Sequence, residues 1–147
     1  MARPKKRSLS QSQEDYLEAI LAISGAGAAV GMRAIAARLG VSMPSANSAV
    51  ARLSRMGLVN HGRYDYVELT REGKRLASAV ASRHALLKRF LTEVLRVPEL
   101  IAEEDACSIE HHLSTETVKA VTRMMEQKEC RTCAVRKTSI RKGRHDG

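Results

Sequence analysis

One stretch of the sequence, residues 32–69, allows very few folds. Residues 32–39 place apolar side chains on one helical face and stop at Gly40, a residue type that commonly follows a helix end. Ser42 can cap a second helix that ends at Gly57, with Pro44 in its first turn, where a missing N–H costs little. Two runs rich in β-formers then flank Gly62 and predict a hairpin. This order of elements predicts a winged helix-turn-helix.

The remaining sequence is helical in pattern. Ser10 and Ser12 each begin a possible capping box for a first helix that runs to about Ser24. Further helices are predicted from Thr70 to about Leu95, from Pro98 to about His112 and from Ser114 to about Glu126. We therefore expect a mostly α protein: an N-terminal winged helix-turn-helix followed by a helical domain. Its predicted parts are a basic tail (1–11), the winged helix (12–74), the helical domain (75–127) and a basic, loose C-terminal tail (128–147).

Charge and composition narrow the function. The net charge is +9, and residues 30–90 hold eleven basic against three acidic residues, which indicates a polyanionic partner such as DNA. Scarce aromatics argue against a β-sandwich and against base stacking on single strands. No apolar run is long enough for a membrane span or a signal peptide, and three cysteines suit a reducing cytoplasm. We expect a cytoplasmic protein that binds double-stranded DNA.

The second helix of the helix-turn-helix is expected to enter the major groove by its N-terminal end. Small side chains there would let the helix sit deep and contact phosphates or base edges, while later arginines and one on the wing would pair with phosphates. The predicted DNA-binding residues are Ser42, Pro44, Ser45, Asn47, Ser48, Arg52, Arg55 and Arg63.

A second pattern predicts a divalent-metal site. Cys107, Glu110 and His111 follow i, i+3, i+4 spacing, so a thiolate, a carboxylate and an imidazole share one helix face. Asp15 and Glu18 likewise share a face of the first helix, and His84 lies on or beside the apolar face of the long helix. Each residue alone has an ordinary explanation as a cap, a core histidine or a surface charge. Inward ligands on three helices do not, because unpaired buried carboxylates are costly.

These motifs together resemble the metal-dependent repressors of the diphtheria toxin repressor and manganese transport regulator group. The resemblance covers about residues 12–126 and rests on E-D-Y-L-E-A-I (14–20), I-A-A-R-L-G-V-S-M-P-S-A-N-S-A-V-A-R-L (35–53), G-L-V (57–59), L-T-R-E-G (69–73), R-H-A-L-L-K-R-F-L (83–91) and C-S-I-E-H-H-L-S (107–114). It implies that the helical domain is a dimerisation and metal-binding domain. It also implies a homodimer that binds operator DNA when loaded with metal and represses metal-uptake genes.

The resemblance also implies the metal ligands. The positions that match the family's ligands are Asp15, Glu18, His84, Cys107, Glu110 and His111. The manganese-selective branch has Glu where Cys107 stands, and the iron-responsive branch has Met where Asp15 stands. Carboxylates suit Mn(II), whereas a thiolate favours Fe(II), Zn(II) or Co(II), so we expect Mn(II) or Fe(II) with a slight preference for Mn(II). Lys88 replaces a Glu ligand of the iron branch's ancillary site, and one or two ions per subunit remain open.

Three alternatives accompany this interpretation. A winged-helix regulator could sense oxidants through Cys107 or through Cys130 and Cys133, whose C-x-x-C spacing is by itself a weak zinc signal. A nucleoid-type DNA binder without sequence preference would not respond to chelation. An enzyme using Cys107 and His111 is not expected, since no oxyanion site or Gly-rich substrate loop is visible.

Overall fold

Most of the chain is helical in the computed structural model, which describes residues 9–25 and 28–141, with side chains through Arg131. The chain divides into two units, one ending at Ser82 and one beginning at Arg83. The division falls inside α4 (Arg71–Arg89), so this helix supplies its first part to one unit and its last part to the other.

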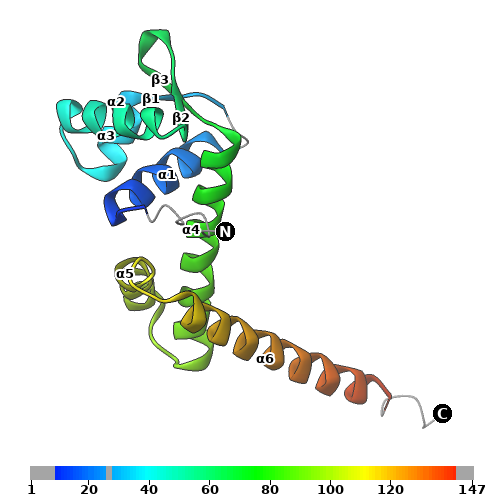
Figure 1. The fold of residues 1–147 in the computed structure, drawn as a ribbon. Coiled ribbons are helices and arrows are strands. Elements are labelled where there is room, and N and C mark those ends of the chain that lie inside the picture. The colour runs from blue at the N-terminus through cyan, green and yellow to red at the C-terminus, as the bar shows by residue number, and fades with distance from the viewer. Residues whose placement is uncertain (1–8, 26–27, 142–147) are drawn as a thin grey trace, which may run out of the picture. The chain divides into compact units, whose positions relative to one another are not determined.

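The first unit is the winged helix-turn-helix that the sequence predicts. It contains α1 (Gln11–Ser24), α2 (Met32–Leu39) and α3 (Met43–Arg55). A small antiparallel sheet has the order β1-β3-β2, formed by β1 (Val30–Gly31), β2 (Val59–His61) and β3 (Tyr66–Leu69). Figure 1 shows the β2–β3 hairpin projecting beyond α2 and α3 as the wing. The sequence pattern missed β1, because two residues are too few to establish an alternation.

The turn between α2 and α3 forms for the reason the sequence suggests. Gly40 takes a left-handed conformation (φ 64°), which a glycine adopts without steric cost. The backbone N–H of Val41 then bonds the Ala36 carbonyl at 3.0 Å, and Ser42 caps α3 by accepting from the Ser45 N–H. Apolar residues of α1, α2, α3 and β3 meet beneath this turn in a fully buried core that includes Leu17, Ile20, Ile35, Val50, Leu53 and Val67.

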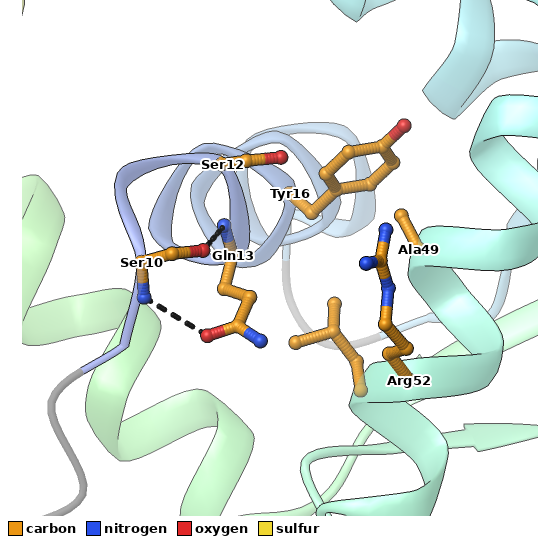
Figure 2. A pocket seen from close by; sticks show the side chains of 7 residues that line it. Ser10, Ser12, Gln13, Tyr16, Ala49 and Arg52 are labelled. Carbon is orange, nitrogen blue, oxygen red and sulfur yellow. Dashed lines mark hydrogen bonds between the residues drawn. The ribbon is translucent and has the colours of Figure 1, made fainter.

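The start of α1 uses one of the two predicted capping boxes. The Gln13 N–H donates to Ser10 Oγ at 3.3 Å, and the Ser10 N–H donates to Gln13 Oε1 at 2.9 Å (Figure 2). The box predicted at Ser12 does not form the cap, because the helix has already begun at Gln11. Ser10 therefore fixes where α1 begins.

The second unit is built from the end of α4 and two further helices. After Arg89 the chain widens into one π-helical turn, η2 (Phe90–Val94), and continues into α5 (Glu99–Ile109) and α6 (Thr115–Arg141). The prediction that the last helix ends near Glu126 and is followed by a loose tail was wrong for residues 127–141, because α6 continues to Arg141. No glycine or proline interrupts residues 115–141, so nothing in the backbone chemistry ends the helix earlier.

The structure describes the two predicted basic tails only in part. Residues 1–8 and 142–147 of the two basic tails lie outside the described residues, as does the side chain of Cys133. Cys130 is described and is an exposed free thiol. Among the described helices, none combines the length and the apolar character needed to cross a membrane.

Candidate metal centre

A buried carboxylate between two imidazoles lies in the second unit. Glu110, at the C-cap of α5, is fully buried, and His111 beside it is only 2% exposed. His84 reaches the same carboxylate from α4: its Nδ1 is 3.1 Å from Glu110 Oε2, while His111 Nε2 is 3.3 Å from Glu110 Oε1. Three of the sequence-predicted metal ligands therefore lie together.

This donor set fits a divalent metal ion. A buried carboxylate is costly unless a positive charge or several hydrogen bonds compensate it. His84 Nδ1 is itself buried and, within the described part of the chain, has no partner in hydrogen-bonding geometry, although it lies so close to Glu110. Imidazole nitrogen and carboxylate oxygen are both good ligands for Mn(II), Fe(II) and Zn(II). The three side chains thus present converging donors of the kind that such an ion takes.

The sequence analysis did not single out Glu103, which holds the other side of His84. Glu103 Oε1 lies 2.8 Å from His84 Nε2, and Glu103 Oε2 lies 2.8 Å from the Lys88 ammonium. Lys88 also lies 3.1 Å from Glu99. The hydrogen bonds from Lys88 and then from His84 hold the pKa of Glu103 below its ordinary value. Lys88 follows His84 by one turn of α4, and Glu103 follows Glu99 by one turn of α5, but spacing within each helix does not show that the two pairs contact one another.

The other three predicted ligands remain predictions. Asp15 and Glu18 lie on α1 in the first unit, where both side chains are half-buried. Cys107 lies one turn before Glu110 on α5 and is exposed.

The predicted DNA-binding residues are all exposed in the first unit. Ser42, Pro44, Ser45, Asn47 and Ser48 occupy the cap and first two turns of α3, Arg52 and Arg55 its later turns, and Arg63 the wing. A small hollow beside this helix is lined by Ser10, Ser12, Gln13, Tyr16, Ala49, Arg52 and Leu53, with the guanidinium of Arg52 lying between α3 and the start of α1 (Figure 2). An exposed helix end and an exposed guanidinium are the features that phosphate contact requires.

Comparison with known proteins decides what kind of regulator this is. The family model for the iron-dependent repressor N-terminal DNA-binding domain matches residues 8–67, and the model for the iron-dependent repressor metal-binding and dimerisation domain matches residues 70–134. A transcriptional regulator of the helix-turn-helix type from Methanocaldococcus jannaschii is 34% identical over 120 residues, which is 81% of this chain and 96% of that protein. The chain belongs to the iron-dependent repressor family.

A bacterial regulator and a solved repressor are also similar to this chain. The transcriptional regulator MntR of Escherichia coli O6:H1 is 44% identical over 94 residues, or 64% of this chain and 59% of that protein. A solved manganese-dependent transcriptional repressor in complex with manganese is 30% identical, has a TM-score of 0.71 and is matched over 78% of this chain and 52% of its own. The chain thus spans about half to three fifths of the length of these two proteins.

Family membership settles several predictions. The resemblance to the diphtheria toxin repressor and manganese transport regulator group is confirmed, as is the order of a DNA-binding and a dimerisation domain. Iron-dependent repressors are DNA-binding transcriptional regulators and not enzymes, so the prediction that this chain is no enzyme is confirmed. The thiol-sensing alternative finds no support in these relatives.

Proposed function

We propose that the chain is a cytoplasmic, homodimeric repressor of metal-uptake genes, which binds operator DNA when loaded with Mn(II) or Fe(II). The observation that carries this proposal is the buried carboxylate of Glu110 held between His84 and His111. Carboxylate and imidazole groups that converge in this way are suited to bind a divalent cation, and they lie in the part of the chain matched by the metal-binding and dimerisation model.

Mn(II) is the slightly favoured metal. Of the six proposed ligands, Asp15, Glu18 and Glu110 offer carboxylate oxygen, His84 and His111 offer nitrogen, and Cys107 alone offers sulfur. Hard oxygen donors suit Mn(II), and the exposed position of Cys107 lowers the weight of the thiolate in this balance. The solved manganese-dependent repressor among the similar proteins supports the same choice.

Metal response would reach the DNA-binding unit through α1. This helix carries Asp15 and Glu18 on one face and packs its apolar residues, among them Leu17 and Ile20, into the core that also supports α3. Without compensation, the carboxylates of Asp15, Glu18 and Glu110 would repel one another. A bound cation would supply the positive charge that offsets this repulsion, and α1 would then hold the two winged helices of a dimer at the spacing of two operator half-sites.

On the DNA, the proposed readers divide into two groups. Ser42, Pro44, Ser45, Asn47 and Ser48 would contact base edges and nearby phosphates from the start of α3. Arg52, Arg55 and Arg63 would contact phosphates, which set the orientation on the duplex but not the sequence preference. Because no long Arg or Gln fork stands at the reading positions, part of the specificity would come from DNA shape.

Anaerobic equilibrium dialysis tests the proposed metal centre. The reduced protein is dialysed against Mn(II) and against Fe(II), beside the double variant Glu110→Ala/His111→Ala and the variant Cys130→Ser/Cys133→Ser. We expect micromolar-range binding that disappears in the first variant and survives in the second, and the ranking of the two metals identifies the cognate one. Binding that follows the tail cysteines would overturn the proposed centre.

A further inference from the structure

Each ring nitrogen of His84 lies close to a carboxylate of α5 or its C-cap. Nδ1 faces the buried Glu110 at 3.1 Å, and Nε2 lies 2.8 Å from the half-exposed Glu103. The imidazole ring is rigid and planar, so fixing the position of Nε2 also fixes the direction of Nδ1. The contact between Nε2 and Glu103 can therefore orient Nδ1, the nitrogen that is proposed to bind metal.

The chemistry of the pair sets the position of the ring proton. An ionised carboxylate can only accept hydrogen bonds, so Nε2 must be the donor to Glu103. In the neutral ring, Nδ1 then has a lone pair directed toward Glu110, which is the form that can coordinate a cation. A hydrogen bond on the outer nitrogen is also known in general to fix the tautomer and orientation of a metal-ligating histidine.

Lys88 keeps Glu103 in this role. Its ammonium lies 2.8 Å from Glu103 Oε2 and 3.1 Å from Glu99 Oε1, and 31% of its side chain is exposed. One oxygen of Glu103 thus accepts from Lys88 and the other from His84. Lys88 and His84 are four residues apart on α4, and Glu99 and Glu103 are four residues apart on α5. The contacts therefore join two consecutive turns of α4 to two consecutive turns of α5.

We propose that Glu103 and Lys88 are positioning residues for the metal centre: Lys88 orients Glu103, and Glu103 holds the His84 ring with Nδ1 directed at Glu110. The inference rests on the proposed function in taking His84 as a metal ligand. Neither residue would touch the ion. Their effect would pass through the orientation of one imidazole ring.

The first measurement uses the metal-free protein. Proton–nitrogen NMR at a pH where His84 is neutral should detect a slowly exchanging, downfield Nε2 proton on His84 in the wild-type chain. Glu103→Ala should abolish that signal, whereas Glu104→Ala, which removes the neighbouring exposed carboxylate on α5, should leave it unchanged. Persistence of the signal in Glu103→Ala would overturn the proposal.

The second measurement is Mn(II) affinity of the same proteins. We expect Glu103→Ala to weaken binding about 10-fold or more, which is the usual effect of losing such a support, and Glu104→Ala to have no effect. Lys88→Met should weaken binding by a smaller factor, and Lys88→Arg should restore it because a guanidinium can bridge the same two carboxylates. Equal affinity in wild type and Glu103→Ala would overturn the proposal.

One further variant separates this inference from the proposed function. If His84→Ala binds Mn(II) as tightly as wild type, His84 is not a ligand and the proposed centre fails, together with any effect of Glu103 on affinity. If His84→Ala loses affinity but Glu103→Ala does not, the metal centre stands and the positioning role alone is refuted.

Discussion

Gly73, in the first turn of α4, lies directly against the backbone carbonyl of Leu58 at the start of the wing. A Cβ built on Gly73 would stand 1.9 Å from that oxygen, a distance at which the backbone must move. The same junction is tied by Thr70, whose N–H donates to the Leu58 carbonyl and whose Oγ1 donates to the Gly57 carbonyl. Helix α4 can therefore approach the hairpin only where residue 73 lacks a side chain.

Gly73→Ala is accordingly expected to destabilise the protein. Alanine favours a helix over glycine by about 1 kcal/mol, but the clash with Leu58 outweighs that gain, and we expect a net loss of more than about 2 kcal/mol in the free energy of unfolding. Chemical denaturation measures the loss. Gly62→Ala is the matched control, since a Cβ there would lie 3.9 Å from its nearest neighbour. Equal stability of Gly73→Ala and wild type would contradict the close approach.

The two serines at the start of α1 should differ in their effect on stability. Ser10→Ala removes the side chain that caps the helix and should lower the free energy of unfolding by about 1 kcal/mol. Ser12 lies two residues later and is exposed, so Ser12→Ala should change stability little. Thermal unfolding of the two variants side by side makes the comparison. A larger loss of stability in Ser12→Ala than in Ser10→Ala would show that Ser10 is not the residue that caps α1.

Glu93 should contribute to stability at neutral pH and not in acid. The guanidinium of Arg89, and after it the ammonium of Lys128, hold the pKa of Glu93 below its ordinary value of 4.5. A carboxyl whose folded-state pKa is lowered stabilises the fold above its unfolded pKa, and this contribution is lost as the pH falls through the folded pKa. Glu93→Gln should therefore be less stable than wild type at pH 7, and the difference should shrink below pH 4.5.

Denaturation at pH 7 and at pH 3 checks this expectation. Glu104→Gln provides a control, because this carboxylate is exposed on α5 and its loss should change stability little at either pH. A constant difference between wild type and Glu93→Gln at both values would mean that the charge of Glu93 does not contribute.

Local sequence chemistry predicted the winged helix well. Gly40, Ser42 and Pro44 act within a few residues of their own positions, so their effects could be inferred without knowledge of the tertiary structure. The length of α6 could not be inferred in this way. The sequence of its second half is polar and basic and shows no apolar stripe that would indicate a helix, and no glycine or proline prevents the helix from extending to Arg141.

The residues of the proposed metal centre were likewise predicted only in part. The i, i+3, i+4 pattern of Cys107, Glu110 and His111 placed a carboxylate and an imidazole on one helix face, and both are buried. The support by Glu103 and Lys88 was not predicted, because it joins charged residues on α4 and α5 that are 15 positions apart and resemble ordinary surface charges. Long-range pairs of this kind leave little trace in local periodicity.

Two residues of α3 should affect DNA binding differently. With an operator enriched from a random duplex pool, Asn47→Ala should weaken specific binding by about 1–3 kcal/mol and relax sequence preference, while leaving metal binding intact. Arg55→Ala should weaken binding to all sequences and lower the slope of log affinity against log salt by about one. Fluorescence anisotropy over a salt series distinguishes them, and identical salt slopes and preferences would refute the proposed roles.

The most direct test of the account is whether DNA binding depends on metal through Glu110. Anisotropy with the enriched operator is measured with Mn(II) and with chelator for wild type, Glu110→Gln and the control Glu104→Gln. We expect Mn(II) to raise operator affinity about 5–150-fold in wild type and in Glu104→Gln, and to have no effect in Glu110→Gln. A full metal response in Glu110→Gln would contradict the account.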